Sequence, residues 1–99
     1  MNERDVERYL VQRVKDAGGE IRKVRFIGRR GAPDRLVMLP GITLWIEVKR
    51  PGGKTKPHQD REHARMTRMG QEVLVVDSRQ AIDELFKGLK HGSKKKIRR

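Results

Sequence analysis

The chain has 99 residues, and its 25 lysines and arginines against 13 acidic residues give a formal net charge of +12. This length suits one domain with a small core, and the absence of cysteine excludes a disulfide framework and a thiolate metal site. So large a positive charge on a small domain is typical of a protein that binds a polyanion, most often nucleic acid.

An apolar stripe at helical spacing predicts a first helix over residues 3–17. Asn2 is placed to cap the start of this helix, and Gly18 and Gly19 are placed to end it. The basic segment 20–26 predicts a short strand at the edge of a sheet, where lysine and arginine discourage unwanted pairing.

Two further strands are predicted over 34–39 and 42–49, with Pro40 and Gly41 as the turn between them. If the loop is even-numbered and centred on this turn, each residue of one strand has a fixed partner on the other. An odd-numbered loop would break this register. The opposed pairs in the even register are Leu36–Trp45, Met38–Thr43 and Asp34–Glu47.

The second half of the chain predicts a helix, a strand and another helix. Thr55 is the expected N-cap of a helix over 57–69. Segment 71–77 is almost continuously apolar, which is typical of a strand buried on both faces. Ser78 is placed to cap a third helix. The predicted order is α-β-β-β-α-β-α, a mixed sheet with helices packed on it.

The ends of the chain bear on its location and domain limits. No apolar run approaches the roughly 20 residues of a membrane span, and the charged start is unlike a secretory signal. We therefore expect a soluble intracellular protein without a membrane partner. Residues 1–89 are expected to form one domain, and the basic segment 90–99 a disordered tail.

Three charged residues are expected to meet at the open end of the hairpin. Asp34 faces Glu47, and Lys49 shares their face because it lies two residues beyond Glu47. Opposed residues have Cβ atoms about 4.5–5.5 Å apart, and two carboxylates so close repel each other unless a cation intervenes. Mg²⁺ would relieve this repulsion. The structural alternative is that Asp34 only caps a turn and that Glu47 and Lys49 form a surface ion pair.

The pattern Gly31-Ala-Pro-Asp34, followed by Glu47-Val-Lys49 and then by Gln59 at a helix start, resembles the PD-(D/E)xK nuclease superfamily. Within it, the chain is similar to the small stand-alone VRR-NUC nucleases of phages and bacteria. The resemblance covers about residues 3–77. It implies a restriction-endonuclease-like αβββαβ core, to which this chain adds a C-terminal helix.

The resemblance implies a metal site and three catalytic residues. Asp34, Glu47 and the backbone carbonyl of Val48 would bind Mg²⁺, with Mn²⁺ as a substitute. Lys49 would orient the attacking water or stabilise charge on the phosphate. The other two residues are Gln59, which would position the lysine or the water, and Glu7, which would contact the metal directly or through water. The alternative for Glu7 and Gln59 is an ordinary exposed residue on a helix.

The basic residues around the site are expected to contact DNA phosphates without reading sequence. They are Arg29, Arg30, Arg50, Lys54, Lys56 and His58. The segment GGKT at 52–55 lacks the first glycine of a phosphate-binding loop, because Val48 stands there, so no nucleotide cofactor is expected. His58 and His63 lack the partners of a zinc site.

The resemblance predicts a metal-dependent, structure-specific DNA endonuclease that hydrolyses phosphodiester bonds in branched DNA such as four-way (Holliday) junctions. It also implies a homodimer in the cytoplasm of a bacterial cell or a phage-infected host. Two alternatives stay open. One is a DNA nuclease that nicks or trims ends without preference for junctions, and the other is a non-catalytic, basic DNA-binding module whose acidic residues are structural.

Overall fold

The structure, a computed structural model, describes residues 1–97. Over this range the chain forms three helices and one four-stranded sheet, in the order that the sequence predicts. None of the described helices is long and apolar enough to cross a bilayer. The elements are α1 (Glu3–Asp16), β1 (Glu20–Lys23), β2 (Arg35–Leu39), β3 (Ile42–Val48), α2 (Pro57–Arg68), β4 (Val73–Val76) and α3 (Arg79–Ile97).

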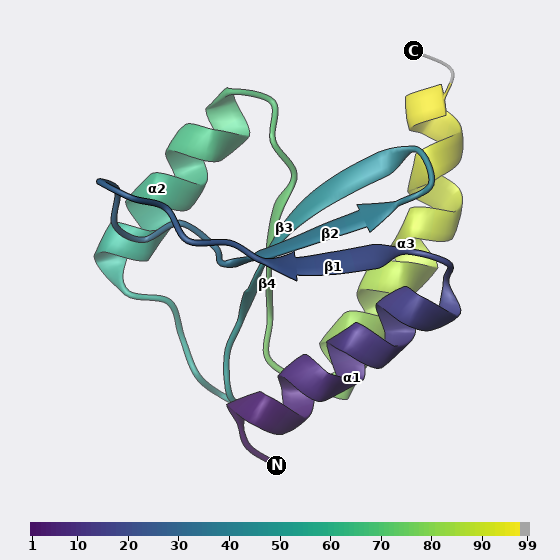
Figure 1. Cartoon of the computed structure of the whole chain (residues 1–99), viewed down its shortest axis with the longest axis horizontal. Helices are drawn as coiled ribbons and strands as arrows, with labels where there is room; N and C mark the ends of the chain where they lie inside the picture. The colour runs from purple at the N-terminus through teal and green to yellow at the C-terminus, as the bar shows by residue number, and fades with distance from the viewer. Residues whose placement is uncertain (98–99) are drawn as a thin grey trace.

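The sheet has the strand order β1-β2-β3-β4, with β1, β2 and β3 antiparallel and β4 parallel to β3 (Figure 1). The β2–β3 pairing is the even register, since Leu36 lies opposite Trp45 and Met38 lies opposite Thr43. Because side chains alternate along a strand, this register places the odd-numbered residues of β3 on one face and the even-numbered residues on the other.

The even-numbered face of β3 carries the hydrophobic core. Helices α1 and α3 lie together on one side of the strands, and α2 lies on the other (Figure 1). Four-residue spacing in α1 keeps its apolar side chains on the face that packs against this core. The buried apolar residues are Val6, Leu10 and Val14 of α1, Val37, Leu44, Ile46, Val48 and Val76 of the sheet, and Ile82 of α3.

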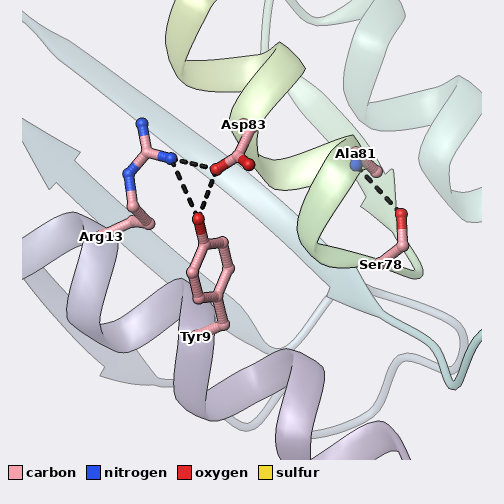
Figure 2. A network of polar contacts seen from close by, with 5 residues as sticks. All are labelled: Tyr9, Arg13, Ser78, Ala81 and Asp83. Carbon is pink, nitrogen blue, oxygen red and sulfur yellow. Dashed lines mark hydrogen bonds and ion pairs between the residues drawn. The ribbon is translucent and has the colours of Figure 1, made fainter. Parts of the chain in front are cut away.

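Polar side chains join α1 to α3 at the edge of this core (Figure 2). The Tyr9 hydroxyl donates to Asp83 Oδ1 at 2.5 Å, and Arg13 forms an ion pair with the same carboxylate. The Arg13 guanidinium also lies 4.7 Å from the centre of the Phe86 ring. Two of the three helices are therefore fastened together away from the hairpin's open end.

The other face of the sheet is only partly covered, and it leads to the open end of the hairpin. Trp45 lies half-buried there, with its Nε1 donating to Gln71 Oε1 at 2.9 Å. The Phe26 ring packs against the indole with ring centres 5.4 Å apart. These contacts hold the Trp45 side chain in place, two residues before Glu47.

Two of the three N-cap residues predicted from the sequence are confirmed. The Asn2 side chain accepts a hydrogen bond from the Asp5 amide at 2.9 Å, and Ser78 Oγ accepts from the Ala81 amide at 3.0 Å (Figure 2). The expected cap at Thr55 is wrong, because Lys56 is the N-cap of α2. Pro57 favours the first helical position, which leaves the preceding residue as the cap.

The strands differ from prediction at the sheet edges. Strand β1 ends at Lys23 rather than at residue 26. Strand β4 is an edge strand, so the prediction that it is buried on both faces is wrong, and Val75 is 45% exposed. A run of valines and leucine in a single chain does not distinguish a central parallel strand from an edge strand that is apolar on both faces.

Helix α3 continues to Ile97, into the basic segment that we expected to be a tail from residue 90. Lysine has a high helix propensity, so a lysine-rich segment can extend a helix that is already formed. Residues 98 and 99 lie outside the described residues. The limit of the domain at residue 89 stays a prediction.

Candidate active site

Three charged side chains meet where the β2–β3 hairpin opens. Asp34 immediately precedes β2, Glu47 lies near the end of β3, and Lys49 directly follows it. Arg35 and Ile46 are the last pair of the ladder, so the register continues with Asp34 opposite Glu47. The Lys49 Nζ atom lies 3.7 Å from Glu47 Oε2. The convergence that the hairpin register predicts is therefore present.

Glu47 is the most strongly perturbed acid of the site. Its side chain is 12% exposed, and its Oε1 atom is buried with no hydrogen-bond partner among the described residues. The pKa of Glu47 is raised to about 7, first by burial and then by the charges of Asp34 and Glu3, while Lys49 opposes the shift. A buried carboxylate that lacks a full set of partners is costly to keep ionised, and such groups gather at functional sites.

His63 of α2 is a site residue that the sequence analysis did not assign. Its side chain is 11% exposed, and its Nε2 atom lies 3.6 Å from Glu47 Oε1. Burial lowers the pKa of His63, and the nearby charge of Lys49 lowers it too. The signal that could have found His63 is its spacing, because residues four apart on a helix share a face and His63 lies four residues after Gln59.

Two acids of α1 bear on the predicted site, and the metal contact expected of Glu7 stays a prediction. Glu7 forms an ion pair with Arg35, whose side chain is 13% exposed, and Glu7 is not among the groups that shift the pKa of Glu47. The α1 acid that acts on Glu47 is Glu3, one turn earlier. Because residues three and four apart share a helix face, the sequence alone could not distinguish these two glutamates.

Gln59 lies in the first turn of α2, beside the loop that leads to Asp34. Its Oε1 atom accepts a hydrogen bond from the Lys56 amide at 2.8 Å. A Cβ atom at Gly31 would lie 3.1 Å from the Gln59 Cα atom, so the loop and the helix start are in close contact. The polar contact that the structure gives Gln59 is therefore a helix cap, close to the site.

Basic side chains surround the start of α2. Burial lowers the pKa of His58, and the charges of Arg30, Lys56, Arg61 and Lys49 lower it as well. His58 thus lies among several cations that the sequence analysis expected on a DNA-binding surface. Arg50 and Lys54 are exposed on the segment before α2.

A hollow of about 440 Å³ adjoins Asp34 on the side of β1. Its basic lining residues are Lys23, Arg25 and Arg29, and Phe26 contributes an apolar wall. Arg29 also lies 3.8 Å from Glu62, a buried carboxylate of α2, which ties the loop before Asp34 to that helix. Cations therefore flank the acidic pair on both sides.

Two known proteins are similar to the chain over most of its length, although no family model matches it. Nuclease p44, a provisionally named protein of Acyrthosiphon pisum secondary endosymbiont phage 1, is 47% identical over 79 residues, which span 79% of this chain and 85% of that protein. A solved VRR_NUC domain superposes with a TM-score of 0.79 at 41% identity, covering 86% of this chain and 94% of that domain. The chain belongs to the VRR-NUC nuclease family.

The VRR-NUC family implies a divalent cation, and the residues present fit one. Asp34 and Glu47 offer two carboxylates, and the buried Oε1 atom of Glu47 accepts no hydrogen bond within the described part of the chain. The β2–β3 register, continued outward, places Pro33 opposite Val48, and a proline has no amide hydrogen to donate to the Val48 carbonyl. That carbonyl is thus suited to bind a cation.

The donor atoms of Asp34, Glu47 and Val48 can be compared with what different cations require. Among the described residues, no group of three or more histidine, cysteine or acidic side chains is arranged to hold a metal ion. Structural zinc sites require about four protein ligands. Mg²⁺ instead keeps several waters and needs only one or two carboxylates. Two carboxylates and a carbonyl therefore suit Mg²⁺ or Mn²⁺ better than zinc.

Proposed function

We propose that this VRR-NUC protein is a divalent-metal-dependent DNA endonuclease that hydrolyses phosphodiester bonds in branched DNA, such as four-way junctions. The observation that carries the proposal is Glu47, a carboxylate buried beside Asp34 and Lys49, with one oxygen atom that accepts no hydrogen bond from any described residue. A structural ion pair would leave no reason to place a second acid against Glu47 at the end of the hairpin.

The chain's own residues have separate roles in this reaction. Asp34, Glu47 and the Val48 carbonyl would hold Mg²⁺, which when bound lowers the pKa of a coordinated water and neutralises phosphate charge. Lys49 keeps its ammonium group near Glu47, at 3.7 Å from Oε2, where it can stabilise negative charge on the phosphate and orient the attacking water. Gln59 holds the start of α2 beside these groups through its hydrogen bond to Lys56.

The basic side chains around the acids bind and orient the substrate. Arg30, Lys56 and His58 lie close enough for their charges to interact, and Arg50 and Lys54 are exposed beside them. Such contacts to phosphates hold DNA without reading its sequence. A homodimer would present two such sites related by a two-fold axis, which suits paired cuts in a two-fold symmetric junction.

The first experiment measures cleavage of a labelled four-way junction and a matched linear duplex in Mg²⁺, Mn²⁺ or EDTA. We expect metal-dependent cleavage of the junction, and we expect Lys49→Ala to lower kcat by about 10²-fold or more. Lys15→Ala is the matched control, because Lys15 is exposed on α1 and lies away from the acids. Sedimentation of the free protein tests the dimer.

The outcomes separate the alternatives. Equal cleavage of junction and duplex would keep the active site but contradict the preference for branched DNA. Binding of DNA without cleavage in either metal would favour a basic binding module, and the acids at the hairpin's open end would then be structural. Cleavage that persists in EDTA would contradict the metal requirement.

A further inference from the structure

Two buried polar atoms face each other in the site without hydrogen bonds. Glu47 Oε1 and His63 Nε2 are 3.6 Å apart, and each lacks a hydrogen-bond partner among the described residues. The two side chains are 12% and 11% exposed. An imidazole nitrogen and a carboxylate oxygen need to approach by only about half an ångström to form a hydrogen bond. Burying two polar atoms without hydrogen bonds costs free energy, and such groups in a folded protein often have a functional role.

The same imidazole reaches the segment that carries the other carboxylate. The backbone of Gly31, three residues before Asp34, lies close enough to His63 to raise the pKa of its imidazole. Gly31 packs so tightly on α2 that a Cβ atom there would lie 2.6 Å from the His58 carbonyl oxygen. His63 therefore lies between the loop that leads to Asp34 and the strand that holds Glu47.

We propose that His63 is a positioning residue of the metal site. By packing between the Gly31 backbone and the Glu47 carboxylate, it sets the spacing of the two acids that hold the cation. This inference rests on the proposed function. His63 supplies no ligand in this arrangement, and it acts on the orientation of Glu47 Oε1. Residues that orient a metal-binding carboxylate through such contacts typically change metal affinity or activity by about 10–100-fold when they are replaced.

The test measures Mn²⁺ binding to the full chain by electron paramagnetic resonance, in which free Mn²⁺ gives the signal. We expect His63→Leu, which keeps the bulk and removes both polar contacts, to weaken Mn²⁺ binding by about tenfold or more. His63→Gln, which keeps a side-chain amide able to reach Glu47, should recover part of this loss. Met66→Ala is the control, because it loosens the packing of the same helix and removes no polar group.

Cleavage kinetics add a second measurement. His63→Leu should lower kcat at fixed Mn²⁺ and leave the KM for DNA unchanged, because the side chain is buried from the substrate. Equal Mn²⁺ affinity in wild type, His63→Leu and His63→Gln would overturn the proposal. So would an equal loss in Met66→Ala, since helix packing alone would then account for it. If the wild type itself binds no Mn²⁺, the proposed function fails first, which the wild-type titration reports separately.

Discussion

At the scale of single residues, the site depends on Glu47, a carboxylate that the fold buries and that is therefore costly to ionise. Burial first, and then Asp34 and Glu3, raise the pKa of Glu47 to about 7. In the unfolded chain the same group has an ordinary glutamate pKa. The folded, metal-free protein therefore holds a proton on Glu47 over a pH range in which the unfolded chain has lost it.

The sign of the resulting pH dependence follows from proton linkage. Below about pH 4.5 both states are protonated and Glu47 costs nothing. As the pH rises from about 4.5 to about 7, the unfolding free energy falls, because ionising Glu47 in the folded protein is harder than in the unfolded chain, and above that range it levels off. We expect Glu47→Gln to raise the Tm of the metal-free protein by roughly 5 °C at pH 8 and to leave it nearly unchanged at pH 4.

Thermal melts at several pH values in EDTA would check this prediction. Glu84→Gln, on an exposed face of α3, is the control and should shift the Tm little at either pH. Added Mg²⁺ should raise the Tm of the wild type at pH 8, since a ligand that binds only the folded state stabilises it, and should not raise that of Glu47→Gln. A Glu47→Gln protein that melts at the wild-type temperature or below at pH 8 would contradict the cost assigned to the carboxylate.

The limits of sequence reasoning are clearest at individual residues. Asp34, Glu47 and Lys49 were predicted to converge because a hairpin turn fixes the partner of each strand residue. His63 was not assigned, because its contact with Glu47 depends on how α2 docks on the sheet, and no local pattern encodes that docking. Glu7 was predicted as the α1 acid of the site, whereas the α1 charge that raises the pKa of Glu47 is that of Glu3; helical spacing permits either.

At the scale of elements, local signals predicted most boundaries, and the sheet edges were the exception. A capping side chain or a two-residue turn acts within a few residues, so Asn2 and the turn at Pro40-Gly41 could be read directly. The place of β4 in the sheet depends on which strand it pairs with, far away in the sequence. Because β4 lies at the edge of the sheet, its Val75 side chain is exposed rather than buried.

The loop before β2 gives a sharp test of element packing. Gly31 and Gly28 both have positive φ angles, of 85° and 79°, but a Cβ atom at Gly31 would lie 2.6 Å from the His58 carbonyl oxygen and one at Gly28 would meet nothing. We expect Gly28→Ala to cost about 1 kcal/mol from backbone conformation alone. Gly31→Ala should cost about 2 kcal/mol more and lower cleavage, because the loop must move off α2.

Urea unfolding of both variants measures the difference, with the denaturant slope compared to the wild type. The two glycines share the conformational cost, so any excess at Gly31 reports its contact with α2. Equal unfolding free energies would mean that the loop and the helix are not packed together in solution.

At the scale of the whole molecule, the chain combines a cluster of acids at the hairpin's open end with a net charge of +12. The core lies between the sheet and the α1–α3 pair, and the site lies at the end of the hairpin toward α2 (Figure 1). This separation lets the surface around the acids be strongly basic without disturbing the core. Under the proposed function, the basic surface would set how tightly DNA is bound, and the acids would hold the metal that cleaves it.

The dependence of DNA binding on salt follows from this division. About five cations around the site, which include Arg30, Arg50, Lys54 and Lys56, would give a slope of about −4.5 in a plot of log K against log salt for duplex DNA. Each of Lys54→Ala and Lys56→Ala should reduce the steepness by about 0.9 and weaken junction and duplex binding alike, because phosphate contacts carry no structural preference. Lys15→Ala should leave the slope unchanged.

Fluorescence anisotropy in EDTA, over about 50–200 mM KCl, measures DNA binding by all three variants without cleavage. A slope that changes in Lys15→Ala and not in Lys56→Ala would place the DNA on the α1 side of the molecule, away from Glu47, and binding and cleavage would then have to use different faces.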